Sequence, residues 1–148
     1  MKTYKVDVDD DGNKYWLLNN KLHREDGPAI EYADGSKQWF LNGKRHRTDG
    51  PAVEYADGTK MWYLNGKCHR DDGPAVEYAG GTKMWFVNGK CHRDDGPAVE
   101  YAGGINHWYL NNKEFTETEW YKQTQKTKAP CVGKVVEIDG VKYKLVEA

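Results

Sequence analysis

The sequence predicts an all-β fold, an elongated antiparallel meander of stacked β-hairpins that ends in a short helix and a terminal hairpin. The tetrad Asp-Gly-Pro-Ala recurs every 23 residues, starting at Asp26, Asp49, Asp72 and Asp95. Tryptophan recurs in the same register, at Trp16, Trp39, Trp62, Trp85 and Trp108. Residues 11–113 lack helical periodicity and are dense in glycine. A fixed period of this length indicates stacked repeats, each of which buries its apolar side chains against its neighbours.

Within one repeat, each segment has a recognisable role. Residues 37–41 are strand formers, and Asn42-Gly43 is a strong signal for a two-residue hairpin turn. Asp49-Gly50-Pro51 predicts a second turn, with its proline at the start of the strand 52–55. Asp57-Gly58 then turns the chain into the next tryptophan strand. Repeats of this kind build an antiparallel meander.

The repeats end on both sides in segments that depart from the pattern. Thr116 and Glu119 have the spacing of a capping box and predict the start of a helix. Asp139-Gly140, between two alternating apolar runs, predicts a hairpin. The predicted divisions are a capping strand at 1–10, hairpin repeats at 11–113, a capping helix at 114–125, a linker at 126–133 and a hairpin at 134–148.

The composition limits the classes of partner. The 148-residue chain has 22 Lys and Arg against 23 Asp and Glu, so it lacks the charge of a general binder of nucleic acid or anionic membranes. We expect no long nucleic acid and no membrane as partner. No apolar stretch approaches a membrane span, and the N-terminus has no apolar run behind it. We therefore expect a cytoplasmic protein, in the host cytoplasm if the source is a virus.

A column of His-Arg pairs is the sharpest chemical feature of the repeats. The candidate binding residues in it are His46, Arg47, His69, Arg70, His92 and Arg93. Equivalent histidines lie about 10 Å apart if each repeat supplies two strands, which is too far to share one metal ion. The same distance argues against a disulfide between Cys68 and Cys91. We predict no metal, no cofactor and no catalytic residues, because active sites are seldom repeated several times.

Two interpretations of this column remain open. In the first, each Arg-x-Asp is an ion pair at a turn and each histidine packs beneath the next repeat. In the second, the arginines bind carboxylate or phosphate while tryptophan or tyrosine stacks on a base, as a nucleotide site would require.

A second aromatic series is a further candidate binding surface. Phe40, Tyr63 and Phe86 alternate with the tryptophans and leucines along the strands and so point to the other side of the sheet. We predict that they contact a partner.

The repeats resemble the MORN repeat, a 23-residue hairpin unit with the pattern N-G-K-x-H-G-x-G followed by a tyrosine-rich strand and D-G. The residues that carry the resemblance are Asn42 to His46 and Asp57-Gly58, with their copies over about residues 11–113. The sequence is most similar to the variant W-Y-L-N-G-K-x-H-R-x-D-G-P-A of bacteriophage, giant-virus and bacterial proteins. The resemblance implies a curved single-layer antiparallel sheet that serves as a scaffold for binding or self-association, and no catalytic chemistry.

These observations give two hypotheses for a non-enzymatic binding protein. In the first, the chain is a protein-interaction adaptor or inhibitor, such as a phage protein directed at a host-defence factor. In the alternative, it sequesters a small phosphate-bearing ligand such as a signalling nucleotide. Exposed edge strands could also pair two copies into a homodimer.

Overall fold

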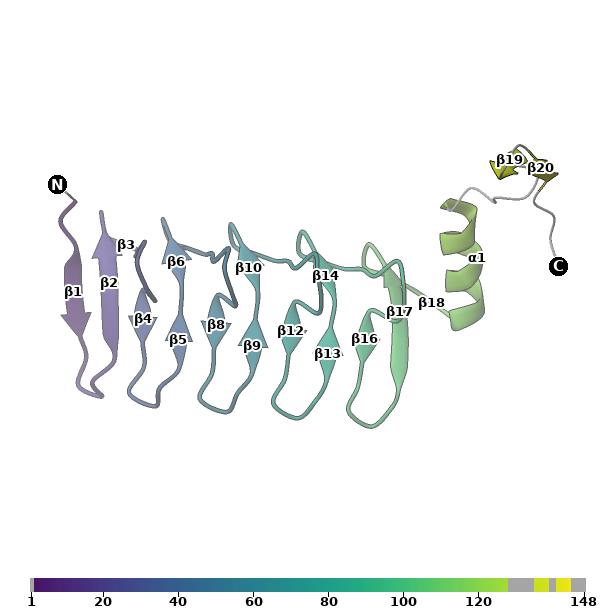
Figure 1. Cartoon of the computed structure of the whole chain (residues 1–148). Coiled ribbons are helices and arrows are strands. Elements are labelled where there is room, and N and C mark those ends of the chain that lie inside the picture. The colour runs from purple at the N-terminus through teal and green to yellow at the C-terminus, as the bar shows by residue number, and fades with distance from the viewer. Residues whose placement is uncertain (1, 128–134, 139–140, 145–148) are drawn as a thin grey trace.

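In the computed structural model of the chain, which describes residues 2–127, 135–138 and 141–144, β-hairpins lie side by side in one layer (Figure 1). A helix follows the last repeat, and a separate two-stranded hairpin follows the helix. The predicted all-β meander of hairpin repeats, with its short helix and terminal hairpin, is confirmed. Each strand of the main path pairs antiparallel with the next, so the repeats extend along one direction.

One long sheet connects all the repeats. Its strands are β1 (Lys5–Val8), β2 (Lys14–Leu18), β3 (Lys21–Leu22), β4 (Ile30–Glu31), β5 (Lys37–Gln38), β8 (Val53–Glu54), β9 (Lys60–Met61), β12 (Val76–Glu77), β13 (Lys83–Met84), β16 (Val99–Glu100), β17 (Asn106–Leu110) and β18 (Lys113–Phe115). Short pairs continue the inner repeats beyond each tryptophan. They are β6 (Phe40–Leu41) with β7 (Lys44–Arg45), β10 (Tyr63–Leu64) with β11 (Lys67–Cys68), and β14 (Phe86–Val87) with β15 (Lys90–Cys91).

Backbone hydrogen bonds carry the pairing through each tryptophan and on to the next repeat. The Trp39 N–H donates to the carbonyl of Ala52 at 2.8 Å, and the Trp39 carbonyl accepts from His46 at 3.1 Å. The Arg47 N–H donates to the Tyr63 carbonyl of the following repeat at 3.1 Å. After the Asn42 turn, residues 46–47 therefore bond to the tryptophan strand before them and to the tryptophan strand of the next repeat. The loop 48–51 follows these residues.

The two turns of each repeat have the predicted chemistry. Asn65 and Gly66 have φ of 51° and 82°, which is the backbone of a type I′ turn. Gly58, with φ of 92°, donates to the Tyr55 carbonyl, while the Tyr55 N–H donates to Thr59. This second turn contains a glycine bulge, which suits the twist of the strands.

The two sides of the sheet carry different side chains. We call the side with the tryptophans the grooved face and the opposite side the tyrosine face. On the tyrosine face Val53, Val76 and Val99 are buried, and Val76 lies opposite Met61 and Met84 in the neighbouring strands. The alanines that follow each proline are fully buried, which explains the absence of any larger side chain there.

Polar residues replace apolar ones in pairs on the tyrosine face. The repeats of Trp62 and Trp85 have Met61 and Met84 on this face and a cysteine, Cys68 or Cys91, seven residues later. In the repeat of Trp39, the second repeat, the same two positions hold Gln38 and Arg45, whose side chains hydrogen-bond at 3.1 Å. In the last repeat they hold His107 and Glu114, which also bond to each other. Each polar side chain thus brings its own partner.

The C-terminal end has the predicted capping box. The Glu119 N–H donates to Thr116 Oγ1, and the Thr116 N–H donates to the Glu119 carboxylate, at the start of helix α1 (Glu117–Thr127). Trp120 is 4% exposed and its indole N–H donates to the carbonyl of Arg93 at 3.0 Å. The helix is thereby fastened to the end of the stack.

The terminal hairpin consists of β19 (Val135–Ile138) and β20 (Val141–Lys144). Its register places Val136 opposite Tyr143 and Ile138 opposite Val141. The predicted Asp139-Gly140 turn and most of the predicted linker 126–133 lie outside the described residues. No helix in the described part of the chain is long and apolar enough to cross a membrane.

The turn geometry makes a prediction about stability. Gly66→Ala should destabilise the fold by about 1–2 kcal/mol because an L-residue disfavours the left-handed backbone. Gly80→Ala is the matched control, since a Cβ there meets open space and its φ is not in the left-handed region. We expect this control to be neutral or slightly stabilising. The measurement is the midpoint of urea unfolding, and equal midpoints for the two variants would contradict the prediction.

Candidate functional site

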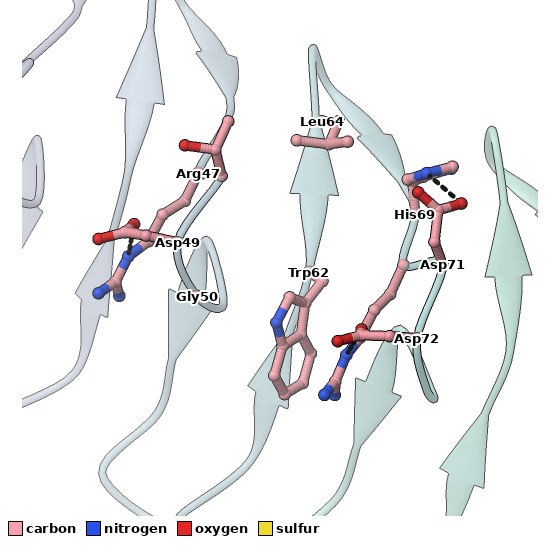
Figure 2. Close-up of a pocket in the computed structure, with 10 residues that line it drawn as sticks. Arg47, Asp49, Gly50, Trp62, Leu64, His69, Asp71 and Asp72 are labelled. Carbon is pink, nitrogen blue, oxygen red and sulfur yellow. Dashed lines mark hydrogen bonds and ion pairs between the residues drawn. The ribbon is translucent and has the colours of Figure 1, made fainter.

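Open grooves recur between successive repeats on the grooved face. The groove in Figure 2 has Trp62 and Leu64 as its floor and the loops at Arg47–Gly50 and His69–Asp72 as its walls. Equivalent grooves lie one repeat before and one repeat after it, over Trp39 and Trp85. The grooves over Trp39, Trp62 and Trp85 have volumes of about 570, 530 and 620 Å³, respectively. The loops at 47–49 and 70–72 each form a wall of two successive grooves.

Each groove wall contains an arginine whose side chain makes several contacts within the fold. The Arg70 Nε–H donates to Asp72 at 2.8 Å, and Nη1 donates to the Pro74 carbonyl at 3.2 Å and to Glu77 at 3.0 Å. The guanidinium carbon lies 4.1 Å from the centre of the Trp62 ring. Three of the five N–H donors are therefore used within the chain. We call this arrangement the arginine clamp.

The clamp recurs with little change in four repeats. The carboxylates that pair with each arginine in turn are Asp26 and Glu31, Asp49 and Glu54, Asp72 and Glu77, and Asp95 and Glu100. The distances from guanidinium carbon to ring centre are 4.2, 4.0, 4.1 and 3.9 Å. Such a stack on tryptophan is a strong form of the cation–π interaction.

The clamp also explains the glycine of the Asp-Gly-Pro-Ala tetrad. A Cβ added to Gly73 would lie 3.1 Å from the guanidinium carbon of Arg70. A Cβ added to Gly96 would lie 2.9 Å from the guanidinium carbon of Arg93. The arginine is therefore held between an indole on one side and a bare backbone on the other.

The histidines connect neighbouring repeats. His69 Nδ1 accepts the backbone N–H of Asn88 at 3.0 Å, and His46 Nδ1 accepts that of Asn65 at 3.1 Å. An accepting Nδ1 requires the proton to be on Nε2, and Nε2 of His69 faces Asp71 at 3.2 Å. His92 faces Asp94 in the same way at 2.9 Å, whereas the residue that follows His46 by two is Thr48.

The charges of the grooved face are sorted into rows. The protruding loops carry exposed acids, which we call the acidic stripe: Glu25, Asp26, Asp49, Asp71, Asp72, Asp94 and Asp95. Lysines border this stripe on both sides. One row lies opposite the clamp glutamates in the strand register and contains Lys37, Lys60 and Lys83, and the other lies opposite the apolar floor residues and contains Lys44, Lys67 and Lys90. The acidic stripe is therefore only as wide as the loops, and positive charge lies on either side of it.

The predicted binding residues lie on two different faces. His46, Arg47, His69, Arg70, His92 and Arg93 line the grooves, whereas Phe40, Tyr63 and Phe86 are half-buried on the tyrosine face. Arg45 lies between two of these rings, 5.7 Å from the centre of Phe40 and 5.5 Å from that of Tyr63. Every one of these side chains has a role within the fold, and its contact with a ligand stays a prediction.

Sequence reasoning missed residues on both faces. On the grooved face it missed the floor residue Leu64 and the exposed Thr48, which lies in the wall of two grooves. On the tyrosine face it missed Tyr55, Tyr78 and Tyr101, which are 40–48% exposed. Their position two residues after the buried valines, on the same face of a strand, was an available signal.

The cysteines and acids offer little reactive chemistry. Cys68 and Cys91 are free thiols, as predicted, and burial raises the pKa of each to about 11. They are therefore protonated near neutral pH, where a nucleophilic cysteine would need to be a thiolate. Among the residues that the structure describes, no group of three His, Cys, Asp or Glu side chains could hold a metal ion.

Comparison with models of known protein families and with curated proteins finds no match to this chain.

The arginine clamp predicts a specific sensitivity. Arg70→Lys keeps the positive charge but loses the planar fork and the stack on Trp62, so we expect it to destabilise the fold by about 2 kcal/mol. The control is the reverse exchange at an exposed site, Lys67→Arg, which should change stability by less than about 0.5 kcal/mol. Urea unfolding measures both, and a stable Arg70→Lys variant would show that the clamp is not needed.

The clamp also predicts a response to acid. The hydrogen bond and charge of Arg70 lower the pKa of Asp72 from its ordinary value of 3.8. In the unfolded chain Asp72 returns to that value and binds more protons, so its contribution is present above about pH 4 and is lost as the pH falls through the folded pKa. Urea midpoints from about pH 2 to pH 6 should fall less steeply for Asp72→Asn than for the unmodified protein. Parallel curves would contradict the assignment.

Proposed function

We propose that this chain is a non-enzymatic scaffold that binds a protein partner across its grooved face. The observation that carries the proposal is the succession of equivalent open grooves, each with an apolar floor and acidic walls, along one side of a single-layer sheet. Repeat proteins use such extended surfaces for binding. A surface that repeats its chemistry suits an elongated partner better than one compact ligand.

The arginine clamp favours this function over sequestration of a phosphate-bearing ligand. Binding of phosphate by Arg47, Arg70 or Arg93 would compete with two carboxylates and a carbonyl that already hold each guanidinium. The exposed acids around each guanidinium would also repel an anion. The charge that each loop presents to a partner is therefore negative.

The repetition also supports a role without catalysis. Each groove contains the same His, Arg and Asp types, so none of them is set apart as an active site. The thiols of the half-buried Cys68 and the buried Cys91 are protonated at neutral pH. The MORN resemblance implies a scaffold for binding or self-association. An adaptor or inhibitor of a host factor, in the cytoplasm, is the form of this function that we propose, and the hairpin fold is compatible with it.

The test is capture of partners by variants that block one face only. Thr48→Trp adds a bulky side chain at an exposed position shared by two grooves. Gly80→Trp adds the same side chain at an exposed turn outside the grooves. From lysate of the source or host cell, the unmodified protein and Gly80→Trp should retain the same stoichiometric protein partner, and Thr48→Trp should lose it.

Two results would overturn the proposal. Removal of the exposed tyrosines by Tyr55→Ser and Tyr78→Ser could abolish capture while Thr48→Trp does not, which would place binding on the tyrosine face. Alternatively, mass spectrometry could find no protein and instead a nucleotide that is released on heating, which would establish the sequestration hypothesis.

A further inference from the structure

The N-terminal segment of the chain already packs against the first copy of the His-acid pair. The Lys2 ammonium forms an ion pair with Glu25, and the Tyr4 ring lies 6.1 Å from the ring of His23 between centroids. His23 is 5% exposed, and its Nε2 has no hydrogen-bond partner in the structure, lying 3.6 Å from Glu25. A lysine and an aromatic ring therefore fit this position.

The equivalent positions in later repeats are open. Asp71 and Asp94 occupy the place of Glu25, two residues after His69 and His92, and their side chains are 86% and 76% exposed. In the described part of the chain, their ion pairs are with these histidines, and no lysine takes the place that Lys2 has at Glu25. Within the described residues, a lysine therefore pairs with this acid in the first repeat, at Glu25, and with neither of its counterparts Asp71 and Asp94.

The opposite end of the stack is covered as well. Trp120 of α1 is buried and donates its indole N–H to the carbonyl of Arg93, whose counterparts Arg47 and Arg70 lie in groove walls. The protein's own side chains therefore pack at both ends of the grooved face. The grooves over Trp39, Trp62 and Trp85 lie between those ends and are open to another molecule.

The arrangement of charges on the grooved face favours an extended occupant over a broad one. A broad basic surface would meet the lysine rows that border the acidic stripe on both sides, whereas an extended segment along the stripe would meet only the acids. Successive grooves are about 10 Å apart, which is two strand spacings. An extended or polyproline II segment covers that distance in about three residues.

We propose that the grooved face binds an extended basic segment of a partner protein, with lysine or arginine at about every third residue and one cationic side chain at each of Asp71 and Asp94. This inference rests on the proposed function and names the partner's chemistry. The ion pair of Lys2 with Glu25 shows the contact that each cation would make. The run of acids is interrupted at Thr48, so the second repeat should bind less strongly.

The experiment measures peptide binding to the full chain at near-physiological ionic strength. One labelled peptide has lysine at every third position between prolines and small polar residues, and a second has the same composition with its lysines in a single run. We expect the spaced peptide to bind more tightly. Asp71→Asn with Asp94→Asn should weaken its binding about tenfold, as expected for the loss of two exposed ion pairs.

Matched variants separate this contact from general electrostatics. Asp10→Asn with Asp11→Asn removes the same charge from an exposed turn away from the stripe and should leave binding unchanged. Thr48→Asp restores the missing acid and should strengthen binding. Equal binding of the two peptides, or equal weakening by both double variants, would overturn the inference.

The outcome also distinguishes the inference from the proposed function. If Thr48→Trp abolishes capture of a protein partner but neither peptide binds, the grooved face binds proteins by another chemistry and only the inference fails. If no capture depends on the grooves, the proposed function fails with it.

Discussion

The arginine clamp is the interaction on which the rest of this structure depends. A single-layer sheet has no second layer to bury its apolar residues, so each repeat must find its burial locally. The clamp does this on the grooved face by covering one side of Trp62 with Arg70 and by attaching the loop at Pro74 to the strand at Glu77. The same residues set the depth of the groove, because they fix where the loop leaves the sheet.

Contacts between repeats turn these local units into one structure. The imidazole of His69 accepts from Asn88 in the following repeat, and the backbone of Arg70 donates to Phe86. Each repeat is therefore bonded to the next at a side chain and at the backbone. Stability in such an array is close to a sum of nearest-neighbour terms, so the ends are its weakest places. Trp120 at one end and the β1 strand at the other cover those ends.

The sequence predicted most of the fold because its signals are local. Asn65-Gly66 specifies its turn within two residues, and Thr116 with Glu119 specifies the helix start within four. The pair of Arg47 with Asp49 was predictable for the same reason. The stack of Arg47 on Trp39 and its bond to Glu54 were not, because these residues meet only after two turns have formed.

The sequence singled out the His-Arg column that lines the grooves but did not predict its arrangement. Strand alternation correctly separated Phe40 from Trp39. The bond from the His46 N–H to the Trp39 carbonyl shows that these two residues face each other across the hairpin, which places the His-Arg column with the tryptophans. The sequence also could not show that the arginines are occupied, since that depends on the distance to Glu54 and Pro51.

That occupancy reverses the chemistry that the sequence alone suggests. Counting arginines along the His-Arg column gives a row of anion receptors, but each guanidinium is bonded to two carboxylates and stacked on an indole. In the loops after His69 and His92, the acid that precedes the clamp aspartate, Asp71 or Asp94, protrudes beyond the clamp and pairs with that histidine. A structural arginine therefore leaves an acidic surface. The column that looks basic in the sequence is the part of this face best suited to a cationic partner.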